Sequence, residues 1–165
     1  MDSIAERYWD QFLESLPAGS ARPAAHAGSF YFGGHPDQAG EIAELVLKGT
    51  KTATGSLLWA YQAEGKRLPR LGDFSIVTNG RDPVCIIETV DVRVVPYDEV
   101  DAHWADEGGE GDRSLASWRR IYWDHIVAEC RRINRSPSRS VPLVMERFRV
   151  VYREPLRSQI SGAGG

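Results

Sequence analysis

Three polar side chains in this sequence have complementary chemistry. Lys51 and Thr54 lie in the segment Gly49–Thr54, directly after a predicted helix end, and Glu88 follows the apolar run Val84–Ile87. A lysine supplies a compact positive charge, and a threonine hydroxyl is inert unless a neighbouring group takes its proton. A carboxylate that follows a buried strand must meet a cation or a donor, or else be protonated. We therefore expect Lys51, Thr54 and Glu88 to surround one polar pocket as its catalytic residues.

Each of these residues also has an ordinary structural explanation. Lys51 could be a surface lysine, Thr54 a turn residue that caps backbone groups, and Glu88 one half of a structural ion pair. Lys51 draws attention because arginine greatly outnumbers lysine in this chain, which suggests that a guanidinium would not serve at that position.

Aromatic and arginine side chains are candidates for contacts with a nucleic-acid substrate. Trp59 or Tyr61 could stack on a base, and Arg119 could hold the phosphate backbone together with the arginines of residues 131–157. That arginine-rich segment contrasts with the acidic residues 98–112, so a basic patch on an acidic body could steer a phosphate-bearing ligand to one face. Two solvated surfaces are the alternative.

The acidic loop 107–112 contributes two more candidates for substrate binding, Glu110 and Asp112. Their oxygens could also bind a hard divalent cation, although the loop lacks a calcium-hand pattern. A solvated loop in which Asp112 helps to cap the next helix is the alternative. The four histidines lack ligand spacing, so we expect no built-in metal site and no resident cofactor, and a divalent metal ion stays possible.

The hydrophobic pattern predicts helices and strands without regular alternation. This indicates an α+β fold with a small, mostly antiparallel, curved sheet or barrel surrounded by helices. We expect residues 1–29 to form a helix and linker packed on the domain, residues 30–153 the domain itself, and residues 154–165 a disordered tail. The expected helices are 4–16, 37–49 with Asp37 as its cap, 56–63, a short helix capped by Asp98, and 115–133; the expected strands are 73–78, 84–95 and 143–152.

Bulk composition excludes several classes of protein. The net charge of −3 argues against indiscriminate nucleic-acid binding driven by salt release. The apolar runs are too short to cross a bilayer, and no secretory leader is recognisable, so we expect a cytoplasmic protein without membrane contacts. Cys85 and Cys130 are expected to be inert thiols in the core.

Several segments form a recognisable pattern when they are taken together and in order. They are GTKTAT (49–54), LPRLGD (68–73), IIETV (86–90), EGGEGD (107–112), Leu115, WR (118–119) and ERF (146–148). This ordered set resembles the ASCH domain family. The downstream segments and the leading aromatic helix, with Tyr8, Trp9, Phe12 and Leu13, resemble its longer bacterial branch, and the resemblance covers residues 4–152. It implies a PUA-like β-barrel of the kind that binds RNA.

The resemblance also implies activities. Some proteins similar to the longer branch cleave single-stranded RNA. A shorter branch removes the acetyl group from N4-acetylcytidine with a lysine, a threonine and a glutamate, which match Lys51, Thr54 and Glu88 in type and order. One departure puts activity in doubt, because Tyr122 stands where the longer branch often has a histidine.

Three functions follow from these observations. The first is a ribonuclease-like hydrolase of single-stranded RNA, and the second is an amidohydrolase that removes acetyl from N4-acetylcytidine-type nucleosides. The third is a non-catalytic module that binds RNA or acts as a regulator. The expected partners are single-stranded RNA or a nucleoside or nucleotide. The sequence does not predict the oligomeric state.

Overall fold

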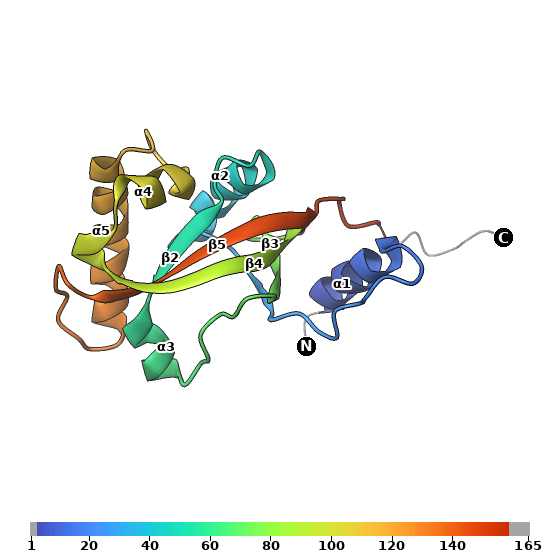
Figure 1. The fold of residues 1–165 in the computed structure, drawn as a ribbon, viewed down its shortest axis with the longest axis horizontal. Coiled ribbons are helices and arrows are strands. Elements are labelled where there is room, and N and C mark those ends of the chain that lie inside the picture. The colour runs from blue at the N-terminus through green and yellow to red at the C-terminus, as the bar shows by residue number, and fades with distance from the viewer. Residues whose placement is uncertain (1–2, 159–165) are drawn as a thin grey trace.

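The computed structural model describes residues 3–158 as helices packed around one mixed sheet (Figure 1). The helices are α1 (Ser3–Ser15), α2 (Pro36–Leu47), α3 (Leu58–Glu64), α4 (Ala102–Gly108) and α5 (Leu115–Arg132), and Tyr97–Glu99 form a short 3-10 turn, η1. The strands are β1 (Ser29–Phe30), β2 (Ala53–Leu57), β3 (Phe74–Thr78), β4 (Pro83–Pro96) and β5 (Pro142–Tyr152).

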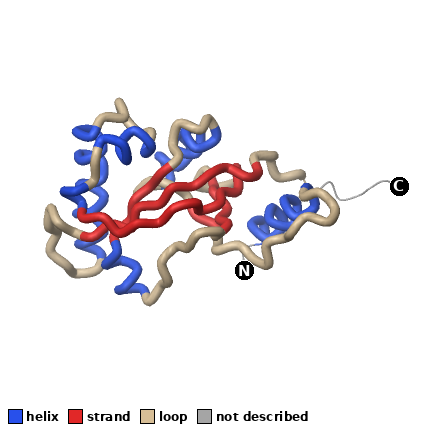
Figure 2. The backbone as a smooth tube through the Cα atoms, in the orientation of Figure 1, coloured by secondary structure: helices blue, strands red, loops and turns tan. Residues whose placement is uncertain are grey.

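The strands lie in the order β1-β3-β4-β5-β2. Only β1 and β3 pair in parallel, whereas β3–β4, β4–β5 and β5–β2 are antiparallel. The predicted α+β class and its mostly antiparallel sheet are therefore confirmed. Within residues 3–158 the sheet is open, with β1 and β2 at its edges, and does not show the closed barrel that was expected. Figure 2 shows the strands as one continuous layer with helices at both ends.

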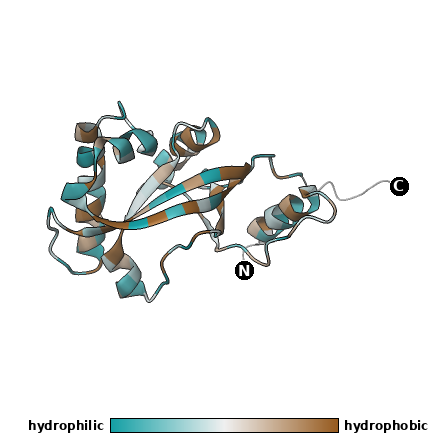
Figure 3. Ribbon diagram, viewed as in Figure 1, coloured by the Kyte–Doolittle hydropathy of each residue, from teal (hydrophilic) through white to brown (hydrophobic). Residues whose placement is uncertain are grey.

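Helices cover the sheet at opposite ends of the molecule (Figure 1). At one end, α4 and α5 pack on β2 and β5 through a core that contains Trp104, Trp118, Tyr122 and Met145. At the other end, α1 buries its aromatic residues against β3 and β4. Figure 3 shows apolar and polar patches alternating around α1 and α5, as expected of helices with one buried side.

Three local expectations are corrected by the structure. α2 is capped by His35, whose Nδ1 accepts a hydrogen bond from the Asp37 backbone, so Asp37 already lies in the first turn. Asp101, not Asp98, caps α4, because its carboxylate accepts from the backbone N–H groups of His103 and Trp104.

The third correction concerns the segment expected to be a helix from Ser56. Residues Ala53–Leu57 form strand β2 instead, and α3 begins only at Leu58. Gly55 fits there because a Cβ on it would stand 2.7 Å from the sulfur of Met145 and 3.4 Å from the ring of Tyr122. Close packing against β5 and α5 therefore determines that residues 53–57 form a strand. The local sequence does not contain this information.

The chain after β5 turns back along α1. The Tyr8 hydroxyl donates to the Glu154 carbonyl at 2.6 Å, and Arg157 pairs with Glu14 at 2.7 Å. Of the tail predicted to be disordered, residues 159–165 lie outside the described residues. No helix within residues 3–158 is long and apolar enough to cross a membrane.

Candidate functional site

A cavity of about 370 Å³ lies between the segment before α2, the start of β2 and one side of α5. Phe32 and the glycines that follow it form one wall, and α5 forms the other. Its size is that of a small-molecule site. Its polar and ionisable lining residues are Gln38, Lys51, Thr54, Glu110, Tyr122, Asp124 and His125.

Lys51 is almost fully buried in the wall of this cavity, with 1 % of its surface exposed. Its Nζ donates to the Glu110 carboxylate at 3.0 Å and to the Gly108 carbonyl at 3.1 Å. Burial would lower the pKa of Lys51, but the oxygens of Tyr122 and Glu110 beside it more than offset this and raise the pKa above its usual value. The ammonium group is therefore charged at neutral pH, and its two hydrogen bonds hold it in one position.

The backbone around Lys51 is held on both sides. After α2, the N–H groups of Thr50 and Lys51 both donate to the Leu45 carbonyl, at 2.9 and 3.0 Å. Thr52 donates to the Glu107 carbonyl at 2.8 Å and accepts from the Phe148 N–H at 3.0 Å. These bonds tie the lysine segment to α4 and β5, so the position of Lys51 depends on two elements distant in sequence as well as on α2.

The α4–α5 connection brings Glu110 to Lys51. Gly109 ends α4 with a φ of +72°, and a Cβ on it would stand 2.6 Å from the Thr50 carbonyl oxygen. Only glycine allows so close an approach in this conformation. Asp112, in the same loop, does not line the cavity. Hydrogen bonds from the side chain and then the backbone of Ser114 lower the pKa of Asp112, and the bond from the Ser114 N–H stabilises the start of α5.

The structure brings two of the three expected catalytic residues together. Thr54 lines the cavity with Lys51 from β2, where it pairs across the sheet with Glu146. Glu88 does not line this cavity. Its carboxylate accepts two hydrogen bonds from the Arg149 guanidinium, at 2.8 and 2.6 Å, on the β4–β5 ladder. The carboxylate that meets Lys51 is that of Glu110.

The aromatic and arginine candidates lie away from the cavity. The ring of Trp59 is covered by the Arg135 guanidinium, 3.7 Å from its centre. The Tyr61 hydroxyl hydrogen-bonds the Ser56 hydroxyl at 2.9 Å. Arg119 lines a different hollow, on the outer side of α5.

Two cavity residues of α5 were not among the predicted site residues, although Tyr122 had been noted as a departure from the longer branch. Tyr122 is buried, stacks on Trp118 with ring centres 4.4 Å apart, and lies beside Lys51. His125, one helical turn later, lines the same cavity and packs close to Gly34. The helical spacing of Tyr122 and His125 could have placed both on one face of α5 from sequence alone.

Glu146 is a further ionisable residue that the sequence did not single out. It faces Thr54 across the β2–β5 pair, and the Thr89 hydroxyl donates to it at 3.5 Å. Burial raises its pKa to about 7. Among residues 3–158, no group of three or more His, Cys, Asp or Glu side chains is placed to hold a metal ion.

Comparisons with known proteins agree with this architecture. The model of the ASCH domain family matches residues 28–152. A crystal structure of an ASCH domain from Lactobacillus crispatus JV V101 superimposes with a TM-score of 0.85 at 31 % sequence identity, covering 93 % of this chain and 99 % of that one. Protein EF3133 of Enterococcus faecalis V583, of the DUF984 family, gives a TM-score of 0.81 at 25 % identity over 93 % and 91 % of the two chains. No curated protein matches the chain significantly. The chain belongs to the ASCH domain family, whose PUA-like fold is associated with RNA binding.

Proposed function

We propose that the cavity binds one nucleotide of a single-stranded RNA and that the protein cleaves the adjoining phosphodiester bond. The observation that carries this proposal is the charged, fully buried ammonium group of Lys51 in the cavity wall, held by Glu110. A cation fixed in advance, away from bulk water, stabilises negative charge that develops on phosphate oxygens in the transition state.

The remaining groups of the cavity supply proton transfer and orientation. In this proposal the ribose 2′-oxygen attacks the neighbouring phosphorus, and His125 accepts the 2′-hydroxyl proton. The bond to the 5′-oxygen breaks as that oxygen takes up a proton from water, and His125 afterwards releases its proton to the solvent. The products are a 2′,3′-cyclic phosphate and a free 5′-hydroxyl. Thr54 orients the phosphate, and Glu110 holds Lys51 in place.

Glu110 takes the role that the sequence assigned to Glu88. The Glu110 carboxylate lies 3.0 Å from the Lys51 ammonium, whereas Glu88 is committed to Arg149. Replacing Glu110 would leave a buried lysine without its counter-charge, which lowers the pKa of that lysine and removes the fixed cation.

A second candidate function, hydrolysis of an amide on a modified nucleoside, is favoured by the size of the cavity and by the presence of Lys51 and Thr54 in it. In that reaction the Lys51 ammonium would stabilise the tetrahedral oxyanion. Because this lysine is protonated, the proton of the attacking hydroxyl or water would have to pass to His125.

Cleavage of end-labelled single-stranded RNA tests the first candidate and separates the two glutamates. We expect Lys51→Ala to slow cleavage by about 100-fold or more, as for loss of one preorganised donor. Glu110→Gln should slow it strongly, whereas Glu88→Gln should stay within about threefold of wild type, the range of a surface ion pair. Equal cleavage by wild type and Lys51→Ala would exclude the proposal, and a larger loss in Glu88→Gln than in Glu110→Gln would return the role to Glu88.

The same variants separate the alternatives. Release of acetate from N4-acetylcytidine without RNA cleavage would favour the amidohydrolase. RNA that is bound but yields no product with ample protein would favour a non-catalytic binding module. Thermal melting of each variant shows whether it is folded at the assay temperature.

A further inference from the structure

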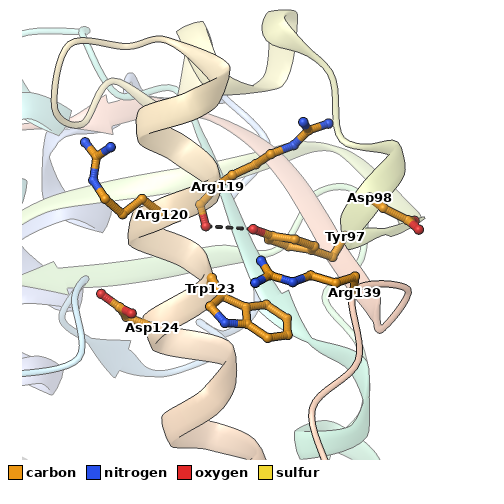
Figure 4. A pocket seen from close by; sticks show the side chains of 7 residues that line it. All are labelled: Tyr97, Asp98, Arg119, Arg120, Trp123, Asp124 and Arg139. Atoms are coloured by element: carbon orange, nitrogen blue, oxygen red, sulfur yellow. Dashed lines mark hydrogen bonds between the residues drawn. The ribbon is translucent and has the colours of Figure 1, made fainter.

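A second hollow, of about 570 Å³, lies on the outer side of α5 (Figure 4). Arg119, Arg120, Trp123 and Asp124 come from α5, and Arg139 comes from the connection between α5 and β5. Tyr97 and Asp98, from η1, complete the lining. We refer to this hollow as the arginine pocket.

The arginine pocket carries more positive than negative charge, with three arginines against two acids in its lining. The side chains of Arg119, Arg120 and Arg139 are exposed, and none of them forms an ion pair with any other residue within 3–158. The lining has only two acids, Asp98 and Asp124. An anion with several oxygens spread along a chain suits such a group of guanidiniums.

The pocket also offers a flat surface for a base. The Arg139 guanidinium lies over the Trp123 ring, 3.7 Å from its centre, and within 6.0 Å of the Tyr97 ring centre. The Tyr97 hydroxyl donates to the Arg119 carbonyl at 2.7 Å, which fixes η1 against α5. Arginine planes and aromatic rings are the surfaces on which proteins stack the bases of single-stranded RNA.

The arginine pocket adjoins the cavity around Lys51. Asp124 lines both hollows, so α5 forms the ridge between them. Figure 4 shows Arg120 and Asp124 on one side of α5, and Arg119, Trp123 and Arg139 on the other side, near Tyr97. A strand that leaves the cavity past Asp124 therefore meets Arg120 on the same side of α5 and reaches Arg119 and Arg139 across the helix.

We propose that the arginine pocket is a second nucleotide subsite for the single-stranded RNA whose neighbouring nucleotide occupies the cavity. Arg119 and Arg120 bind consecutive backbone phosphates, and a base stacks on the face of Arg139 that Trp123 leaves free. This inference rests on the proposed function only in that the same strand reaches the cavity, and it requires binding of RNA but not its cleavage.

Binding of an octanucleotide of 2′-O-methyl RNA, which lacks the attacking hydroxyl, tests the subsite without turnover. The double variant Arg119→Ala/Arg120→Ala should weaken this binding about tenfold or more and leave the affinity for cytidine monophosphate unchanged. The slope of log affinity against log salt concentration should fall in magnitude by about 1.4, which is about 0.7 for each phosphate that the variant no longer neutralises. Arg139→Ala should weaken octanucleotide binding with little change in that slope, because it removes mainly stacking.

Arg131→Ala is the matched control, because Arg131 is an exposed arginine further along the same helix that lines neither hollow. The sequence grouped it with Arg119 as a candidate for backbone contacts, so this variant separates the pocket from the general positive charge of residues 131–157. It should leave octanucleotide affinity within about twofold of wild type. Three results would overturn the inference. The first is an unchanged octanucleotide affinity in the double variant, which would assign the pocket to another anionic ligand. The second is an equal loss of affinity in Arg131→Ala, and the third is no octanucleotide binding by wild type.

The two proposals fail separately. If the octanucleotide binds through the arginine pocket but unmodified RNA is not cleaved, the subsite stands and the ribonuclease function falls. If RNA is cleaved at the Lys51 cavity while the double variant binds and cleaves as wild type does, only the subsite falls.

Discussion

Glu146 is a carboxyl group that forms no ion pair with any of residues 3–158, and its ionisation should be visible in the stability of the protein. Burial raises its pKa from 4.5 to about 7 in the folded state. Between these two values the folded chain binds more protons than the unfolded chain, so the free energy of unfolding falls as pH rises through this window. The raised pKa costs no stability below about pH 4.5, and by pH 8 it lowers the free energy of unfolding by at most about 3.5 kcal/mol, from a pKa difference of about 2.5 at about 1.4 kcal/mol per unit.

Urea denaturation of wild type and Glu146→Gln at pH 5 and pH 8 measures this effect. We expect wild type to lose more stability than the variant between the two pH values, and Glu146→Gln to be the more stable protein at pH 8. Other titrating groups are common to both proteins and cancel in the comparison. The same change in stability with pH for both proteins would contradict the raised pKa of Glu146.

At the scale of single residues, the sequence predicted most of the side chains near the candidate site. It did not predict which of them contact one another. Lys51 and Thr54 were identified by type and position, and Glu110 was identified as a contact residue. Glu88 was grouped with them because a carboxylate after an apolar run needs a cation. The cation that it meets is on Arg149, 61 residues away, and only strand pairing between β4 and β5 decides this.

At the scale of elements, the α4–α5 connection determines whether Lys51 and Glu110 meet. We expect Gly109→Ala to cost more than about 2 kcal/mol of stability, because alanine is strained at a φ of +72° and its Cβ would lie 2.6 Å from the Thr50 carbonyl. Relief of that close approach moves the loop that carries Glu110, so RNA cleavage should fall as well. Denaturant melts and cleavage rates below the melting temperature measure both effects.

Gly65→Ala is the control for Gly109→Ala. Gly65 ends α3 with a φ of +64°, but nothing lies within 4 Å of a Cβ placed there. This variant should show the strain of the left-handed backbone alone, about 1 kcal/mol, with unchanged cleavage. If the two variants behave alike, the close approach of the loop to Thr50 has no role in the site.

The elements that could be predicted from sequence are those with a long, regular pattern. Helices α1 and α5 and strand β4 show clear periodicity, and the turn after β3 is formed at Asn79, whose side chain accepts from the Arg81 and Asp82 backbones. Strand β2 lacks such a pattern, since its alternation of small and hydroxylated residues has weak strand propensity. Whether these residues form a strand depends on their contacts with β5 and α5, and the local sequence does not show those contacts.

At the scale of the whole molecule, α1 lies at one end of the sheet, and α5, which forms one wall of the candidate site, lies at the other (Figure 1). Phe12 is 3 % exposed and packs against the rings of Phe74 and Tyr152, with centres 6.0 and 5.5 Å away. Phe12→Ala should therefore destabilise the protein by about 3 kcal/mol or more, through lost burial and the cavity left behind. None of the atoms removed touches the wall around Lys51.

This separation predicts that stability and activity can be changed independently. Phe12→Ala should lower the melting temperature by several degrees and keep the wild-type kcat and KM for RNA at temperatures where it is folded. Asp10→Ala, an exposed change on the same helix, should alter the free energy of unfolding by no more than about 0.5 kcal/mol and leave kcat and KM unchanged. A fall in kcat for folded Phe12→Ala would mean that strain at the α1 end reaches the site through β4 and β5, the two long strands that extend from the α1 end of the sheet to α4 and α5.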